Sequence, residues 1–192
     1  MHLRTLSFAF ALVLVACSGD KGDSSTDTDT DTTGTGTTGP TDPTEGPLDP
    51  ACSCLETDSC GAQICERVGL VCEEECGDEP TVDDEAALQC ALEALRDRKP
   101  GRLYWYNIPS VTTTYNTRVY IQADGDAIVE ESGGVDLCNY TGPDVRRKLK
   151  EPAYFADCLA LATSNERFTC MADGFGEQVV ECRPLNESCS EF

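Results

Sequence analysis

The chain has 192 residues, and 35 Asp and Glu residues against 14 Lys and Arg residues give it a formal net charge of −21 at pH 7. A surface of this sign repels phosphates, so the composition argues against nucleic-acid binding and against close adhesion to an anionic surface. Thirteen cysteines exceed what structural roles use in a reducing compartment, which indicates an oxidising location outside the cytoplasm.

Residues 1–16 have the pattern of a signal peptide. One arginine, Arg4, precedes an apolar run of eleven residues over 6–16. The run is too short for a transmembrane helix, which needs about 20 residues. We therefore expect 1–16 to be cleaved from the mature protein.

The apolar run ends in Leu14-Val15-Ala16-Cys17, which resembles the lipobox of bacterial lipoproteins. The resemblance implies cleavage before Cys17, acylation of the Cys17 thiol with diacylglycerol, and retention in a membrane through the attached lipid. The alternative is an ordinary signal peptide that is followed by an incidental cysteine.

The segment 17–50 is the expected lipidated cysteine followed by a disordered acidic tether. Its one large apolar side chain is Leu48, so it cannot bury enough surface to offset the entropy lost on ordering. The Asp/Thr/Gly composition resembles tethers of myxobacterial cell-envelope lipoproteins. Ser18 follows the lipidated cysteine, where an aspartate would signal retention in the inner membrane. The resemblance thus implies a lipid anchor in the outer membrane, facing the periplasm or the surface.

The cysteine count favours disulfides over metal. Without Cys17, twelve of the thirteen cysteines remain, an even number. The chain has no Cys-x-x-Cys, and its single histidine, His2, lies in the signal peptide, so the spacings and ligands of zinc sites are missing. We expect twelve paired cysteines and no bound metal or cofactor; the connectivity is not deducible from spacing.

Six of these cysteines fall in residues 51–80, which have little apolar material. A core this small needs disulfides, so we expect a compact knob with one helical turn near 62–68, separate from the following domain. The six are Cys52, Cys54, Cys60, Cys65, Cys72 and Cys76.

Residues 81–192 are expected to form an α+β domain, an antiparallel sheet with two helices packed on it. A leucine stripe predicts the first helix over 82–98, with Thr81 as N-cap. An aromatic strand over 102–108 follows. Asp124-Gly125 predicts a tight hairpin between strands 117–123 and 127–131, with Ile121 opposite Ile128 and Arg118 opposite Glu131.

The remaining elements are expected as a short strand over 135–138, basic helical turns over 143–150, and a second helix that opens at Pro152. A second hairpin is expected from strands 167–171 and 178–182.

The mature chain has no histidine, so Ser-His-Asp, Cys-His and His-metal mechanisms are excluded. A pair of carboxylates among Asp124, Asp126, Glu130 and Glu131 is the remaining basis for catalysis, as in a glycan hydrolase. In a chain with 35 acids, neighbouring acids occur by chance. We therefore favour a protein that is not an enzyme.

Two groups are candidate binding residues. Tyr104 and Tyr106 share one face of a strand and would stack on sugar rings or anchor a protein if exposed; alternatively they lie under a helix. The only basic cluster contains Arg146, Arg147 and Lys148. It would bind an anionic partner, dock on the acidic 51–80 segment, or form a solvated helix face.

These observations predict a lipid-anchored, disulfide-stabilised envelope protein that binds or scaffolds a partner without catalysis. The expected partners are the membrane, through the lipid, and an envelope glycan or protein. The alternatives are a carboxylate-based envelope glycan hydrolase and a purely structural envelope protein.

Overall fold

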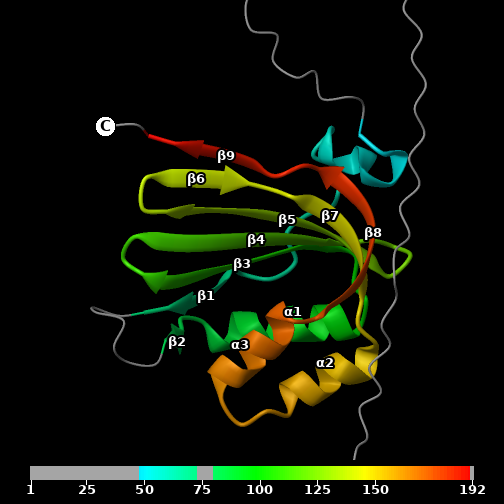
Figure 1. The fold of residues 1–192 in the computed structure, drawn as a ribbon. Coiled ribbons are helices and arrows are strands. Elements are labelled where there is room, and N and C mark those ends of the chain that lie inside the picture. The colour runs from blue at the N-terminus through cyan, green and yellow to red at the C-terminus, as the bar shows by residue number, and fades with distance from the viewer. Residues whose placement is uncertain (1–47, 73–79, 191–192) are drawn as a thin grey trace, which may run out of the picture. The chain divides into compact units, whose positions relative to one another are not determined.

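The computed structural model describes residues 48–72 and 80–190. The predicted signal peptide, Cys17 and nearly all of the predicted tether lie outside the described residues. Figure 1 shows one large sheet with the α-helices gathered on one side of it. The predicted α+β class is confirmed.

The described residues form one 3₁₀ helix, three α-helices and nine strands. In chain order these are η1 (Pro50–Leu55), β1 (Val68–Val71), β2 (Thr81–Val82), α1 (Glu85–Arg96), β3 (Gly101–Ser110), β4 (Thr113–Ile121), β5 (Asp126–Val135), β6 (Cys138–Thr141), β7 (Asp144–Leu149), α2 (Pro152–Leu159), α3 (Ser164–Ala172), β8 (Phe175–Arg183) and β9 (Asn186–Cys189).

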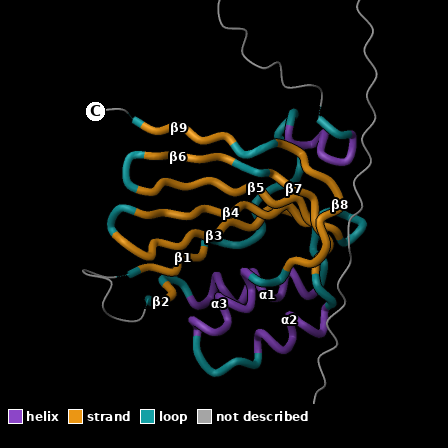
Figure 2. The backbone as a smooth tube through the Cα atoms, in the orientation of Figure 1, coloured by secondary structure: helices purple, strands orange, loops and turns teal. Residues whose placement is uncertain are grey.

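The strand order along the sheet is β2-β1-β3-β4-β5-β6-β9, and β7 joins the sheet by pairing with both β5 and β8. The pairs are antiparallel except for β1 and β3, which run parallel. Figure 2 shows the long β3–β4 and β5–β6 hairpins extending beyond the helices.

Helix α1 matches the predicted leucine stripe but begins three residues later than expected. Leu88, Leu92 and Leu95 are fully buried. The N-cap is Asp84, whose carboxylate accepts the Ala87 amide, and not Thr81, which lies in strand β2. Strand pairing at residues 81–82 therefore leaves the capping role to the next suitable side chain.

The β4–β5 hairpin turns at Asp124-Gly125 as predicted, but the predicted register is wrong by one residue. Tyr120 lies opposite Ile128, and Arg118 lies opposite Glu130. The loop has three residues, 123–125, because Gln122 bonds Asp126 across its base. Gly125 has φ +87°, the left-handed conformation that such a loop requires of its last residue.

Two predicted elements after residue 141 are wrong. In place of the helical turns predicted over 143–150, Asp144–Leu149 form strand β7, because Val145 and Leu149 alternate into the core while the strand pairs with β5 and β8. Residues 167–171 belong to helix α3. Its start is fixed by a capping box between Thr163 and Glu166, a signal that outweighs the β-forming residues behind it.

The described part of 51–80 is not a separate domain. Residues 43–192 form one unit, and β1 lies inside the sheet beside β3. The only helix within 51–72 is η1, which ends at Leu55, so the helical turn expected at 62–68 is wrong; residues 68–71 pair as a strand instead.

Disulfides join this segment to the rest of the fold. The pairs are Cys52–Cys182, Cys54–Cys60, Cys65–Cys90, Cys138–Cys189 and Cys158–Cys170, and Cys72 is disulfide-bonded as well. Every cysteine that the structure describes is thus oxidised, as predicted.

Two hydrophobic cores lie on opposite faces of the sheet. The larger one, on the inner face, packs α1, α2 and α3 against residues such as Leu103, Trp105 and Val119. The smaller one, on the outer face, packs η1 and its neighbours against Tyr120, Ile128 and Cys182. Of the described residues, the N-terminal segment, residues 48–63, covers one end of the outer face and leaves the rest of that face open.

Candidate functional site

The open part of the outer face carries a row of large polar side chains on β3, β4 and β5. Tyr104 pairs with Arg118 across β3 and β4, and Arg118 pairs with Glu130 across β4 and β5. Arg102 pairs with Tyr120 one step along. Because alternate residues of a strand face the same side, these five side chains stand on one surface.

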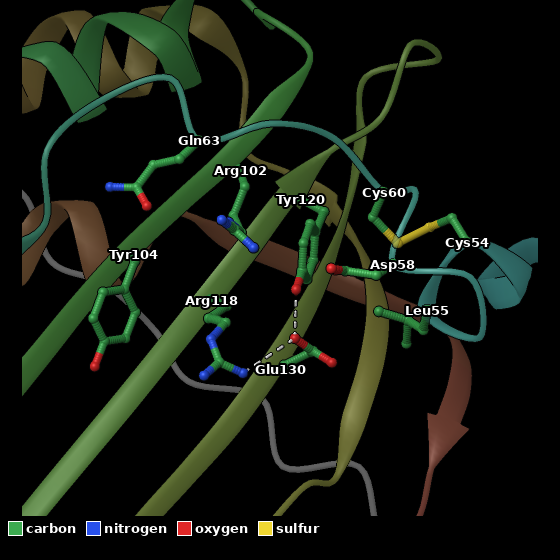
Figure 3. Close-up of a pocket in the computed structure, with 10 residues that line it drawn as sticks. All are labelled: Cys54, Leu55, Asp58, Cys60, Gln63, Arg102, Tyr104, Arg118, Tyr120 and Glu130. Carbon is green, nitrogen blue, oxygen red and sulfur yellow. Dashed lines mark hydrogen bonds and ion pairs between the residues drawn. A yellow bond between two sulfur atoms is a disulfide. The ribbon is translucent and has the colours of Figure 1, made fainter.

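A cavity of about 590 Å³ lies where this row meets the N-terminal segment. We call it the outer-face pocket. Figure 3 shows Asp58, Leu55 and the Cys54–Cys60 disulfide on one side of the strand side chains, and Gln63 on the other side, near Arg102 and Tyr104. The Cys54–Cys60 disulfide closes the loop that carries Asp58 and holds this loop in place at the edge of the pocket.

Glu130 is the centre of the hydrogen bonding in the outer-face pocket. The Tyr120 hydroxyl donates to Glu130 Oε2 over 2.7 Å, and Arg118 Nη1 lies 3.8 Å from the same oxygen. Arg183 Nη1 approaches the other oxygen at 3.4 Å. Burial and the bond to Glu130 raise the pKa of Tyr120 to about 12, so its hydroxyl stays a donor at physiological pH.

The two arginines of the outer-face pocket have fewer ion pairs and hydrogen bonds than Glu130 within the described residues. Arg118 is 55% exposed, and its guanidinium lies 5.9 Å from the centre of the Tyr104 ring. Among residues 48–72 and 80–190, Arg102 forms no ion pair, and its interaction partner in the pocket is the neutral Tyr120 hydroxyl. The pocket therefore presents a cation that lacks a described carboxylate partner.

Tyr104 and Tyr106, predicted together from the sequence, have different settings. Their rings lie 6.4 Å apart on the outer face, and both are half-buried. Tyr104 lines the pocket and donates to Asn116 Oδ1 over 2.7 Å. Tyr106 lies outside the lining and donates to Asp83, a bond that together with burial raises the pKa of Tyr106. Neither tyrosine lies under one of the described α-helices, which pack on the other face of the sheet.

The basic cluster is divided by the strand that carries it. On β7, Arg146 and Lys148 share one face and contact the acids of the β4–β5 turn: Arg146 pairs with Asp124 and Asp126, and Lys148 Nζ lies 2.9 Å from Asp126 Oδ1. Arg147 points to the other face. Arg146 also donates to the Ala51 carbonyl over 3.0 Å, which is the contact between this cluster and the N-terminal segment.

The four carboxylates considered for catalysis are dispersed. Asp124 and Asp126 are held by the basic residues of β7, and Glu131 lies on the face opposite Glu130. Glu130 alone of the four lines the outer-face pocket.

Asp144 is a carboxylate that the sequence analysis missed. It is 6% exposed and shares Arg183 with Glu130. Burial, and then the negative charge of Glu130, raise the pKa of Asp144 to about 6. Asp144 lies in the basic segment 143–150, which was predicted to be helical, so the sequence did not predict its burial beside Glu130.

The other missed residues are Arg102, Arg118, Asp58 and Gln63. The signal for the two arginines was present, because Arg102 shares a face of β3 with Tyr104, and the correct β4–β5 register places Arg118 beside Glu130. Asp58 reaches the pocket in the loop closed by Cys54–Cys60, and Gln63 reaches it through a parallel bridge to Arg102; both are far from the pocket strands in sequence, and no local pattern predicts these contacts.

Within 48–72 and 80–190, no helix is long and apolar enough to cross a membrane. Over the same residues, no three His, Cys, Asp or Glu side chains lie close enough together to hold a metal ion. Comparisons with protein-family models, with curated proteins and with solved structures found no match.

Proposed function

We propose that this chain is a lipid-anchored protein of the bacterial cell envelope that binds a glycan, without catalysis, in the outer-face pocket. The observation that carries the proposal is the lining of that pocket. A tyrosine ring, two arginines and hydrogen-bonding groups of both kinds surround a cavity of about 590 Å³ on the face of the sheet opposite the three α-helices.

This lining suits the chemistry of sugars. A tyrosine ring packs on the apolar face of a pyranose, and the hydroxyls at its edge need both donors and acceptors nearby. Arg102, Arg118 and Gln63 supply donors, and Asp58 and Glu130 supply acceptors. Binding without catalysis is favoured because the oxygens of Glu130 are already engaged. Glu130 accepts a hydrogen bond from the Tyr120 hydroxyl and pairs with Arg118 and Arg183.

The first prediction concerns the ligand. Tyr104→Ala should weaken binding to purified cell-wall glycan strands by about tenfold or more, because the loss of about 1.4 kcal/mol of stacking changes affinity tenfold. Binding is measured by titration of the mature chain in detergent micelles, with thermal melting as the check on folding.

Tyr115→Ala is the matched control. Tyr115 is a tyrosine of the same sheet that is 40% exposed and lies outside the pocket lining, so its removal should leave binding unchanged. Equal affinities of the two variants would refute the pocket as the glycan site. Release of new reducing ends by the wild type, abolished in Glu130→Gln, would instead support the hydrolase alternative.

The second prediction concerns the anchor, which rests on the resemblance at Leu14-Val15-Ala16-Cys17. Cys17→Ala should leave the precursor uncut or release the protein from membranes, because the variant offers no thiol for acylation. The measurement is incorporation of an alkyne fatty acid in a bacterial host, with Cys17 intact as the positive control. Label retained by the alanine variant would exclude lipidation at Cys17.

A further inference from the structure

A second depression lies on the same face as the outer-face pocket. It has a volume of about 560 Å³ and lies near the ends of β4, β5 and β6. Its floor is formed by uncharged residues, Thr114, Asn116, Ser132, Gly134 and Asn139. The one charged residue that lines it is Asp136, in the turn between β5 and β6.

The strand register places the outer-face pocket and the second depression in one line along β4. We call this line the track. Asn116 lies opposite Ser132, and Thr114 lies opposite Gly134, two and four residues along β4 from Arg118. With a rise of about 3.3 Å per strand residue, the track from Tyr120 to Thr114 is about 20 Å long. The Tyr104–Asn116 hydrogen bond joins the hollows, because Tyr104 lines the outer-face pocket and Asn116 lines the second depression.

We infer that this track binds a linear glycan of several sugars that carries an isolated carboxylate, with the carboxylate seated at Arg102 and Arg118 and the neutral sugars extending toward Asn139. The inference rests on the proposed function and adds the length, the charge and the direction of the ligand. The hydroxyl and amide groups of the second depression suit neutral sugars, which form hydrogen bonds but no ion pairs.

The direction follows from the charges at the two ends. Arg102 forms no ion pair within the described residues, and Arg118, which lies 3.8 Å from Glu130, is 55% exposed, so both guanidinium groups have N–H groups left to donate to a carboxylate. Asp58 and Glu130 also line the outer-face pocket, but its two arginines offset their charge, whereas the lining of the second depression has Asp136 and no cation. The ligand therefore has its charged sugar in the outer-face pocket and not in the second depression.

The net charge of the whole chain limits how much charge the ligand carries. At −21, the protein repels a polymer with a carboxylate on every sugar, and two arginines cannot offset that repulsion along the track. A mostly neutral chain with a single carboxylate gains the contact with the arginines and avoids most of the repulsion.

The test uses the mature chain in detergent micelles and three sets of probes, measured by titration calorimetry. The first is neutral β-1,4-linked N-acetylglucosamine chains of one to six sugars. The second is the same chains with one terminal sugar oxidised to a carboxylic acid. The third is polyuronate chains of matching length. We expect affinity to rise with length over several sugars, the single carboxylate to add about tenfold, and polyuronates to bind more weakly than the singly charged chains.

Two variants separate the two ends of the track. Arg102→Gln should remove the advantage of the carboxylate and keep the dependence on length. The double variant Ser132→Ala with Asn139→Ala should flatten the dependence on length and keep the advantage of the carboxylate. Thr113→Ala is the control, because Thr113 lies on β4 outside both linings, and it should change neither.

Binding that a single sugar saturates, with no effect of the double variant, would overturn the extended track. If Tyr104→Ala still abolished that binding, the proposed function would survive alone. Equal affinity for neutral and carboxylated chains would overturn the assignment of the arginines. Failure of the wild type to bind any of the three sets would overturn both the track and the proposed glycan site.

Discussion

Replacing Cys52 and Cys182 with serine should lower the free energy of unfolding by about 5 kcal/mol, the largest effect that we expect from a change of one residue pair. The disulfide joins residues 130 positions apart, so its loss greatly increases the entropy of the unfolded chain. Cys52 also lies fully buried in the outer core, where the N-terminal segment packs on the sheet.

Cys54→Ser with Cys60→Ser is the matched control. That disulfide closes a loop with a sequence separation of 6, and the same entropy argument gives a loss of about 2 kcal/mol. Denaturant unfolding of the two double variants measures both losses. Equal losses would show that the length of the closed loop does not determine the contribution of Cys52–Cys182.

Asp144→Asn should make the protein more stable than the wild type at pH 7, and the gain should disappear near pH 4. The pKa of Asp144 is raised to about 6 in the folded protein, so folding opposes its ionisation. The stabilisation by the protonated form is complete below the pKa of the unfolded chain and is lost as the pH rises through about 6. A shift of about two pKa units corresponds to about 3 kcal/mol.

The measurement is the free energy of unfolding of both proteins from pH 4 to pH 7. Asp124→Asn is the control with the opposite sign. Partial burial of Asp124 opposes its ionisation, but the Asp126 amide and the Arg146 guanidinium outweigh it and lower the pKa of Asp124. Asp124→Asn should therefore lose stability at pH 7 and approach the wild type at low pH. Parallel pH profiles of Asp144→Asn and the wild type would contradict the raised pKa of Asp144.

The parts of the fold that were predictable are those with strong local signals. The leucine period of α1, the alternation of Leu103 and Trp105 against Tyr104, and the turn at Gly125 each follow from neighbouring residues. The inner-face burial of Leu103 and Trp105 and the half-buried outer face of Tyr104 agree with that alternation.

The wrong predictions concern elements whose structure depends on contacts with other parts of the chain. Residues 143–150 were predicted as basic helical turns from their arginines and lysines, but β5 and β8 pair with 144–149 on either side and make that segment a strand. The one-residue error in the β4–β5 register came from counting two loop residues where Gln122 and Asp126 enclose three. The error mattered for the candidate site, since a slip of one residue puts every side chain on the wrong face.

The outer-face pocket itself was only partly predictable. Tyr104 was identified from its place in the aromatic strand. The opposite wall depends on which cysteines pair, and spacing alone does not determine that. Asp58 faces Glu130 across the pocket because the loop closed by Cys54–Cys60 lies over the outer core.

The Cys52–Cys182 disulfide also determines how the protein responds to mechanical force. A membrane anchor would exert force on the polypeptide before Cys52. Cys52 lies two residues after the start of η1 and is covalently bonded to Cys182 in β8, so it would transmit this force to β8. The load therefore reaches β8 directly, and from there the hydrogen-bonded pair of β7 and β8. The N-terminal segment cannot be peeled from the outer face one hydrogen bond at a time. Under tension, the wall of the pocket should stay in place until the sheet itself yields.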